Sequence, residues 1–311
     1  MRLTADRNGR TVATFDVYTT QHREHATMNK PCLFAVLAAV GLLITVSIAT
    51  GQGDVHGHAQ GTIKDFVAPL VFQAAGPTAE AIQGTVDAFR AALGEPNNLN
   101  TLQSLTAGRR EINWDGGGVD ATTPPVTPFN VFLNTRGAQF TTPGTGLSQA
   151  PPEGGPQGGL EILFSNPTYG SIFSTFSPPR LFTPVGSNVT EAAFFVPGTN
   201  GSITATVTGF GAVFTDVDEP DGSGPVKKRG NRGASTLMEF FGVDGKPLFS
   251  SFVPASPGDG SLSFFGVVFS DARIARVRIT TGDIAPGPGD DERHDIVMMD
   301  DFIYGEPQAL P

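Results

Sequence analysis

The sequence predicts a mainly β protein, an antiparallel β-sandwich with one amphipathic helix near the start of its folded part. Segments rich in Phe, Val, Ile and Thr alternate with turn residues at spacings of about 8–15 residues, which is typical of a sandwich. Gly and Pro are abundant, at 39 and 25 residues, without the three-residue period of collagen. Phe occurs 24 times against three Tyr and one Trp, so we expect aromatic side chains to fill a core.

The first 49 residues predict an exported protein. Residues 33–48 are uncharged and almost entirely apolar, and they follow Met28-Asn29-Lys30. This arrangement is typical of a signal peptide over residues 28–49, cleaved after Ala49 or alternatively after Ala59. A permanent span is the less favoured alternative because it needs about 20 apolar residues. Residues 1–27 are interpreted as an extension upstream of the true start.

Composition then excludes several classes of function. The net charge is −10 with the leader and about −12 without it, so the surface repels nucleic-acid phosphates and anionic lipids. We therefore expect no nucleic-acid partner, and no membrane partner after signal cleavage. Cys32, the only cysteine, lies in the leader, which excludes disulfides and thiolate metal sites. His294 is the only histidine after His58, so histidine-ligated metals and a Ser-His-Asp triad are disfavoured.

One helix is expected in the segment 76–108, after a segment 50–75 that carries the first strand. Its apolar stripe has helical spacing, between Thr78 and Gly94. The stripe consists of Ile82, Val86, Phe89 and Leu93. A shorter helical turn is expected to follow, with Leu99, Leu102 and Leu105. We expect the helix to lie against one end of the sandwich.

The sandwich itself is expected over residues 109–311. Strands are predicted at 111–114, 130–133, 138–141, 160–164, 191–196, 201–208, 211–217, 235–241, 247–253, 261–269, 273–280 and 295–304. Residues 243–246, with Asp-Gly between two apolar runs, predict a hairpin with a two-residue turn. Gly, Pro, Asp and Thr dominate three expected loops at 117–128, 143–159 and 282–291.

Four stretches in the last third of the chain carry a family resemblance. They read GFGAVFTDVD at 209–218, MEFF at 238–241, SFFGVVF at 263–269 and IVMMDDFIYGE at 296–306. This part resembles uncharacterised secreted bacterial proteins, many with a Pro-Glu-Pro (PEP-CTERM) sorting tail. The resemblance implies a jelly-roll sandwich similar to carbohydrate-binding modules, and it implies no activity. The chain departs from the sorted members because QALP at 308–311 is no apolar tail, so we expect free release.

Asp300 and Asp301 are the most informative polar pair. Alternation along a strand would place Asp300 with Met298 and Phe302 on one face and Asp301 on the other. The same alternation would add Ile296 and Tyr304 to the face of Asp300, and Val297, Met299 and Ile303 to that of Asp301. One carboxylate would then lie among apolar side chains and would need an arginine, several backbone donors or a metal ion.

Two interpretations of that carboxylate stay open. Jelly-roll modules often hold a structural Ca²⁺ there, and carboxylate oxygens are ligands that Ca²⁺ prefers. A salt bridge or a hydrogen-bonded carboxylate is the other interpretation, with Arg136 or Arg180 as the partner.

Other candidate site residues are weaker. Asp216 and Asp218 begin an acidic turn over 216–222, which is either a cation loop or a solvated turn, and which lacks the later Glu of an EF-hand. Sugar stacking would use Trp114, Tyr169 or Tyr304.

The sequence therefore favours a secreted, non-catalytic β-sandwich that binds an extracellular polysaccharide or contributes to the cell surface. The alternative is a carbohydrate-active hydrolase or lyase on the same fold. That alternative needs two carboxylates about 5–10 Å apart across a cleft, and the sequence pairs no two.

Overall fold

A computed structural model describes residues 2–5, 11–14, 68–116, 120–218, 236–289 and 294–310. The chain divides into two units, residues 1–61 and 62–311. In the first unit, β1 (Arg2–Ala5) pairs antiparallel with β2 (Thr11–Thr14). The predicted leader at 28–49 lies outside the described residues. None of the helices in the described part of the chain is long and apolar enough to cross a membrane.

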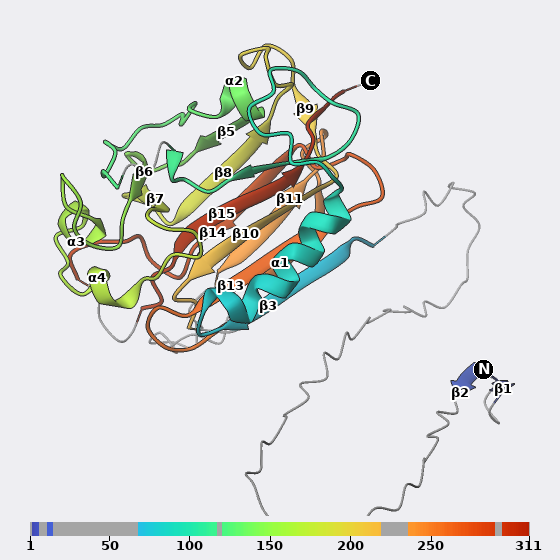
Figure 1. The fold of residues 1–311 in the computed structure, drawn as a ribbon, viewed down its shortest axis with the longest axis horizontal. Helices are drawn as coiled ribbons and strands as arrows, with labels where there is room; N and C mark the ends of the chain where they lie inside the picture. Colours follow the sequence, from blue (N-terminus) through green and yellow to red (C-terminus); the bar gives the residue numbers. More distant parts are fainter. Residues whose placement is uncertain are drawn as a thin grey trace, which may run out of the picture. The chain divides into compact units, whose positions relative to one another are not determined.

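The second unit contains two antiparallel sheets that pack face to face (Figure 1). The seven-stranded sheet has the order β3-β13-β10-β15-β7-β6, and β4 pairs with β15. Its strands are β3 (Leu70–Gly76), β4 (Arg109–Ile112), β6 (Gly146–Ala150), β7 (Leu181–Val185), β10 (Gly209–Thr215), β13 (Leu262–Val268) and β15 (Met298–Gly305). The antiparallel β-sandwich predicted from the sequence is confirmed.

The five-stranded sheet has the order β12-β11-β14-β8-β5. Its strands are β5 (Ala138–Thr141), β8 (Val189–Phe194), β11 (Leu237–Phe241), β12 (Pro247–Phe252) and β14 (Arg276–Thr280). Two short strands, β9 (Ala205–Thr206) and β16 (Gln308–Ala309), form a separate pair.

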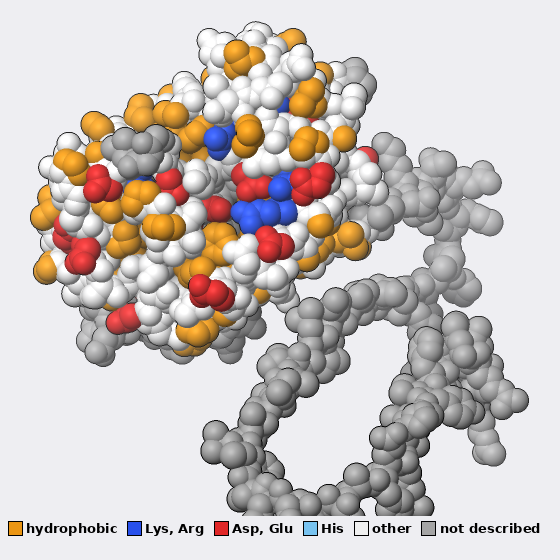
Figure 2. Space-filling model, in the orientation of Figure 1, with side chains coloured by type: hydrophobic (Ala, Val, Ile, Leu, Met, Phe, Trp, Pro, Cys, Tyr) orange, Lys and Arg blue, Asp and Glu red, His pale blue; other side chains and the backbone are white. Residues whose placement is uncertain are grey.

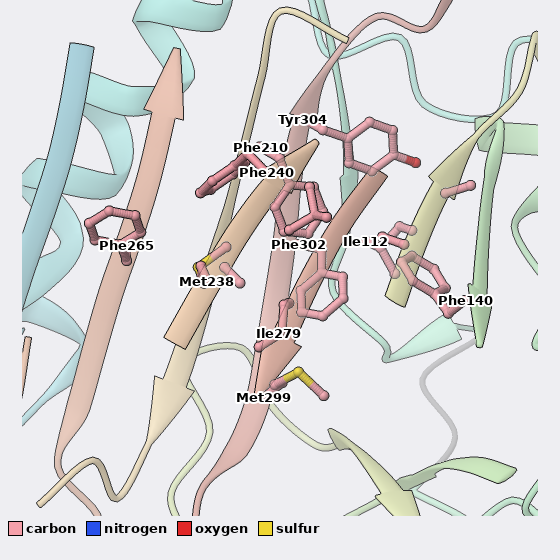
Figure 3. Packing of buried hydrophobic residues seen from close by; sticks show 14 of the residues in the cluster. Ile112, Phe140, Phe210, Met238, Phe240, Phe265, Ile279, Met299, Phe302 and Tyr304 are labelled. Carbon is pink, nitrogen blue, oxygen red and sulfur yellow. The ribbon is translucent and has the colours of Figure 1, made fainter. Parts of the chain in front are cut away.

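The core between the sheets is dominated by aromatic side chains, as the excess of Phe predicts (Figure 3). Phe210 and Phe302 from the seven-stranded sheet pack edge to face at 5.3 Å. Phe240 and Met238 come from the five-stranded sheet and belong to the same cluster. Burying rings with no polar group leaves few hydrogen bonds to satisfy inside the sandwich.

Helix α1 (Ala79–Leu93) is confirmed, and its four predicted apolar residues are the ones that it buries. It packs on the outer face of the seven-stranded sheet, over β3 and β13, so its expected place at one end of the sandwich is wrong (Figure 1). Gly211 and Gly266 lie directly opposite each other and leave a notch for the Phe89 ring. A Cβ at either glycine would come within 2.9 Å or 2.8 Å of that ring, so the helix approaches closely because both are glycine.

The segment after α1 is a loop, so the further helical turn expected around Leu102 is wrong. A buried ion pair organises this loop instead. Arg110 binds Glu306 through Nε at 2.6 Å and Nη2 at 2.7 Å. Its guanidinium also donates to the carbonyl oxygens of Leu99, Thr101, Gln103 and Thr135. The N–H groups of this one guanidinium thus hold the loop against the end of β15.

A second group of short helices covers the other end of the seven-stranded sheet. It contains α3 (Leu160–Leu163) and α4 (Tyr169–Ile172), whose apolar side chains pack on residues of β6, β7 and β15. The strand expected at 160–164 is therefore wrong, because a short apolar run does not distinguish a strand from a helix. The strand expected at 130–133 is also wrong, since this segment leads into α2 (Leu133–Arg136).

Three other expectations are corrected. The loop expected at 143–159 contains β6, and the strand expected at 201–208 shrinks to β9. The hairpin of β11 and β12 is confirmed, but its turn is longer than the two residues expected. Gly242 N–H donates to the Lys246 carbonyl at 3.0 Å, and Gly245 adopts a φ of 73°, which favours glycine.

Candidate functional site

The outer face of the five-stranded sheet is open, and we take it as the candidate site. Residues of β8 and β11 alternate between buried and partly exposed. Every residue of β10, β13 and β15 is buried. The helices that cover the seven-stranded sheet have no counterpart in the described contacts of β8, β11, β12 and β14. No described helix therefore covers the side chains on this face.

Strand register arranges these outward side chains in rows across the sheet. The middle row contains Ser250, Glu239, Arg278, Glu191 and Thr141. One neighbouring row contains Pro247, Phe241, Arg276, Ala193 and Gln139. The other contains Phe252, Leu237, Thr280 and Val189. With strands about 4.8 Å apart, a five-residue row is about 19 Å long.

Two arginines and one glutamate fix the centre of this face. Arg278 reaches Glu191 Oε1 with Nη2 at 2.6 Å and Nε at 2.8 Å. Arg276 Nη1 reaches the same oxygen at 2.8 Å. The Arg276 guanidinium also lies 3.9 Å from the centre of the Phe241 ring, within cation–π range. These contacts hold donors and an acceptor in place before any ligand arrives.

A depression lies beside this network. Its volume is about 290 Å³, and it is lined by Thr141, Thr142, Pro143, Val189, Glu191 and Arg278. This volume lies just below the range for small-ligand pockets, which is about 300–1,000 Å³. The lining combines a carboxylate, a guanidinium and hydroxyls with two apolar residues, so it suits a small polar unit.

The opposite side of the molecule carries the predicted Asp300–Asp301 pair, in a β-bulge. Ala212 pairs with Phe302 and Phe214 pairs with Met299, so two residues of β15 face Val213 alone. The expected alternation is therefore wrong, because Met299 and Phe302 both point into the sandwich core. The bulge lets both carboxylates turn toward the segments that cover the sheet.

Asp301 contacts both covering segments. Its Oδ1 accepts a hydrogen bond from Ser177 Oγ at 2.5 Å, and its Oδ2 lies 3.6 Å from Arg90 Nη2 of α1. Burial raises the pKa of Asp301 to about 6, although Ser177 and Arg90 oppose the shift. This carboxyl therefore links α1 to the segment that follows α4.

Asp300 is fully buried beneath the same segment. Its Oδ2 accepts hydrogen bonds from the backbone N–H of Phe176 at 2.6 Å and of Ser177 at 3.2 Å. Burial raises the pKa of Asp300 well above its usual range, and the charge of Asp301 adds to this. Asp115 Oδ2 lies 3.2 Å from the same Ser177 Oγ, and burial raises the pKa of Asp115 as well. Three carboxyls thus surround one serine hydroxyl.

The expected arginine partners of the pair are wrong. Arg136 donates to the Glu111 carbonyl and to Asn100, and Arg180 donates to the carbonyls of Trp114 and Ala121. Arg90 is the partner instead, and its place directly after Phe89 in α1 is the sequence signal that could have suggested it. Asp300 and Asp301 accordingly have protein donors, as the interpretation of a salt-bridged or hydrogen-bonded carboxylate requires.

The calcium interpretation has no support from a cluster of metal-binding side chains among the described residues. The described residues contain no group of three or more His, Cys, Asp or Glu side chains that could hold a metal ion. Asp216 is buried at the end of β10, and Asp218 is exposed and accepts from Gly258 N–H at 2.9 Å. The rest of that acidic turn lies outside the described residues. Calcium binding at Asp300, Asp301, Asp216 or Asp218 stays an interpretation of the sequence, which the described contacts do not test.

A surface patch of charges accompanies the buried carboxyls. Figure 2 shows acidic and basic side chains gathered beside α1. Arg90 lies 3.1 Å from Glu111, and Arg109 lies 2.6 Å from both Glu111 and Glu95. These opposite charges neutralise one another, so this patch offers a partner less free charge than its composition suggests.

The three aromatic residues proposed to stack on sugars are fully buried, so that expectation is wrong. Trp114 stacks on Phe182 with ring centres 3.7 Å apart. Tyr304 Oη donates to the Arg136 carbonyl, and burial raises the pKa of Tyr304 far above its usual value. Tyr169 Oη accepts from Gly287 N–H. Aromatic type alone does not report exposure, so the sequence could not separate core rings from surface rings.

Comparison with protein-family models, with curated proteins and with solved structures finds no match for this chain. The resemblance to secreted proteins of the PEP-CTERM type therefore stays a prediction. The described residues define a class of protein, an antiparallel β-sandwich in which described helices cover the outer face of one sheet.

Proposed function

We propose that this protein is a secreted, non-catalytic β-sandwich that binds an extracellular polysaccharide with the outer face of its five-stranded sheet. One observation carries the proposal, the prearranged network of Arg276, Arg278 and Glu191 beside a depression on an otherwise open face. Export rests on the sequence of residues 28–49.

The chemistry of the face supports a sugar ligand. Sugar hydroxyls both donate and accept hydrogen bonds, and the face presents guanidinium donors, a carboxylate acceptor and the Gln139 amide. Because ion pairs already hold Arg276 and Arg278, binding orders few further side chains and costs less entropy. A row about 19 Å long offers an extended polymer more contacts than a single small molecule can use.

The alternative function, a hydrolase or lyase, has one geometric feature in its favour. Glu191 and Glu239 lie two strands apart in the same row, which places their backbones about 10 Å apart. Paired catalytic carboxylates that invert a glycosidic bond are about 6.5–9.5 Å apart. Arg278 stands between them in the row and binds Glu191, so a substrate would have to displace it.

Binding of a panel of soluble polysaccharides, measured by affinity electrophoresis and calorimetry, tests the proposal. Arg278→Ala should weaken binding at least tenfold, because it removes a donor and leaves Glu191 less fixed. Arg273→Ala is the matched control, since Arg273 also pairs with a carboxylate, that of Asp271, but lies before β14. No binding by the wild type, or equal binding by both variants, would overturn the proposal. Release of reducing ends that is lost in Glu191→Gln would favour the hydrolase instead.

A further inference from the structure

Strand β3 leaves an unprotected edge on the seven-stranded sheet. It pairs with β13 on one side, and the described residues place no strand on its other side. An unpaired edge presents a row of backbone N–H and C=O groups that can pair with another chain. Figure 1 shows β3 at the margin of the sheet, beside α1.

The other edges are covered or interrupted. Phe129 exchanges two backbone hydrogen bonds with Phe140 along β5. Val126 does the same with Leu147 along β6. On β12, Pro247 and the adjacent irregularity in register interrupt the edge. Among the described edge strands of the two large sheets, β3 alone has none of these protections.

The amino-acid composition of β3 also distinguishes it from a protected edge strand. Its sequence, Leu-Val-Phe-Gln-Ala-Ala-Gly, has no charge and no proline, in a chain with a net charge of −10. Leu70 is 62 % exposed and Val71 is 44 % exposed. Edge strands that stay single normally carry Lys, Pro or a bulge. β3 has the features of a strand that is paired in its working state.

We propose that β3 pairs antiparallel with β3 of a second copy of this chain, so that the two seven-stranded sheets form one continuous sheet across a twofold axis. With Gln73 on the axis, Phe72 meets Ala74 of the second copy and Val71 meets its Ala75. Leu70 meets its Gly76. Each large side chain faces a small one, so the strand is self-complementary, as a twofold interface requires. No charge of one strand meets a like charge of the other, although each copy carries a net charge of −10.

Engineered disulfides test this register directly. Residues directly opposite in an antiparallel pair have Cα atoms about 4.5–5.5 Å apart, within the range that a disulfide spans. In a Cys32→Ser background of the full chain, Gln73→Cys should therefore form a covalent dimer on mild oxidation. Val71→Cys should not, because the two copies of residue 71 would be four residues apart, about 13 Å. Combining Val71→Cys with Ala75→Cys should restore the cross-link.

The oligomeric state of the unmodified chain gives an independent measurement. Sedimentation should show a dimer, and Gln73→Lys should raise its dissociation constant at least tenfold, because two like charges would then meet at the axis. Gln157→Lys, in an exposed loop, is the matched control and should leave the dimer unchanged. A monomeric wild type overturns the proposal, as does equal cross-linking at positions 71 and 73. Circular dichroism of each variant checks that the fold is kept.

Discussion

The two sheets of this sandwich differ in how many of their faces are covered. The seven-stranded sheet packs against the second sheet on one face and against α1, α3 and α4 on the other. Among the described helices and strands, none packs across the outer face of β8, β11, β12 and β14 in the five-stranded sheet. The strands follow this difference, since β10 and β13 are continuous apolar and small-residue runs whereas β14 alternates Arg276, Val277, Arg278 and Ile279. Whether polar and apolar residues alternate along a strand thus indicates whether one or both faces of its sheet are covered.

The two sheets also differ in how much their side chains contribute to stability. The covered sheet buries large side chains on both faces, so substitutions there should cost stability. The open sheet carries its charges on a partly exposed face, where they cost little stability, as the proposed polysaccharide-binding face requires.

The largest expected effect comes from truncating the ring that joins α1 to the covered sheet. Phe89 is fully buried, with the Phe264 ring centre 5.3 Å away. Phe89→Ala should lower the free energy of unfolding by about 3–5 kcal/mol, measured by chemical denaturation. Phe241→Ala, on the open face, should cost about 1 kcal/mol or less. Similar losses for the two variants would contradict the division between the sheets.

The next effect is a pH dependence that arises from Asp301. Its pKa is about 6 in the fold and about 4 in an unfolded chain. The folded state therefore binds the proton more tightly, and this residue's contribution to stability falls as the pH rises from 4 through 6. Relative to Asp301→Asn, the wild type should lose about 2 kcal/mol between pH 4 and pH 7. Parallel stability curves for the two proteins over this pH range would show that the proton is not held in this way.

A smaller effect tests the glycine notch. Gly211→Ala should destabilise the protein by about 1–3 kcal/mol, because its Cβ would press on the Phe89 and Phe264 rings. Gly84→Ala is the control, since its Cβ meets open space on α1. That change should stabilise the helix by about 0.5–1 kcal/mol. Thermal melts of both variants measure the difference, and two changes of the same sign would refute the notch.

The smallest expected effect concerns calcium. Because Asp300 and Asp301 already accept hydrogen bonds from protein donors, the melting temperature should be the same with added Ca²⁺ and with a chelator. A bound ion at a hundredfold excess over its dissociation constant would instead add about 2.7 kcal/mol. A rise with Ca²⁺ that disappears in Asp301→Asn would restore the calcium interpretation for that residue. A rise that survives would place the ion at Asp216 and Asp218.

Elements with a strong local period were predictable from the sequence. The stripe of α1 and the hairpin of β11 and β12 are examples, because their partners are a few residues away. β7 was missed because Pro184 and its flanking turn residues disguise a short strand. The buried tyrosines and Trp114 were misjudged because exposure depends on what covers a residue, and a single sequence does not contain that.

The candidate site was less predictable for the same reason. The sequence singled out Asp300 and Asp301, but Arg90 lies more than 200 positions away, and only the packing of α1 brings it to them. The row of Glu239, Arg278 and Glu191 joins three strands through their register, and register is a property of the assembled sheet. The alternation of charged and apolar residues in β14 indicated an open face, but it did not indicate which strands lie beside β14.

Strand β15 lies in the middle of the seven-stranded sheet, yet it follows every other strand of that sheet in the chain. Ribosomes add residues at about 5–20 per second, so more than 200 residues emerge before the strand that joins β10 to β7 and β4 exists. Glu306, the partner of buried Arg110, arrives later still. The seven-stranded sheet therefore cannot close until β15 has been synthesised, and contacts of such long sequence separation make that closure slow.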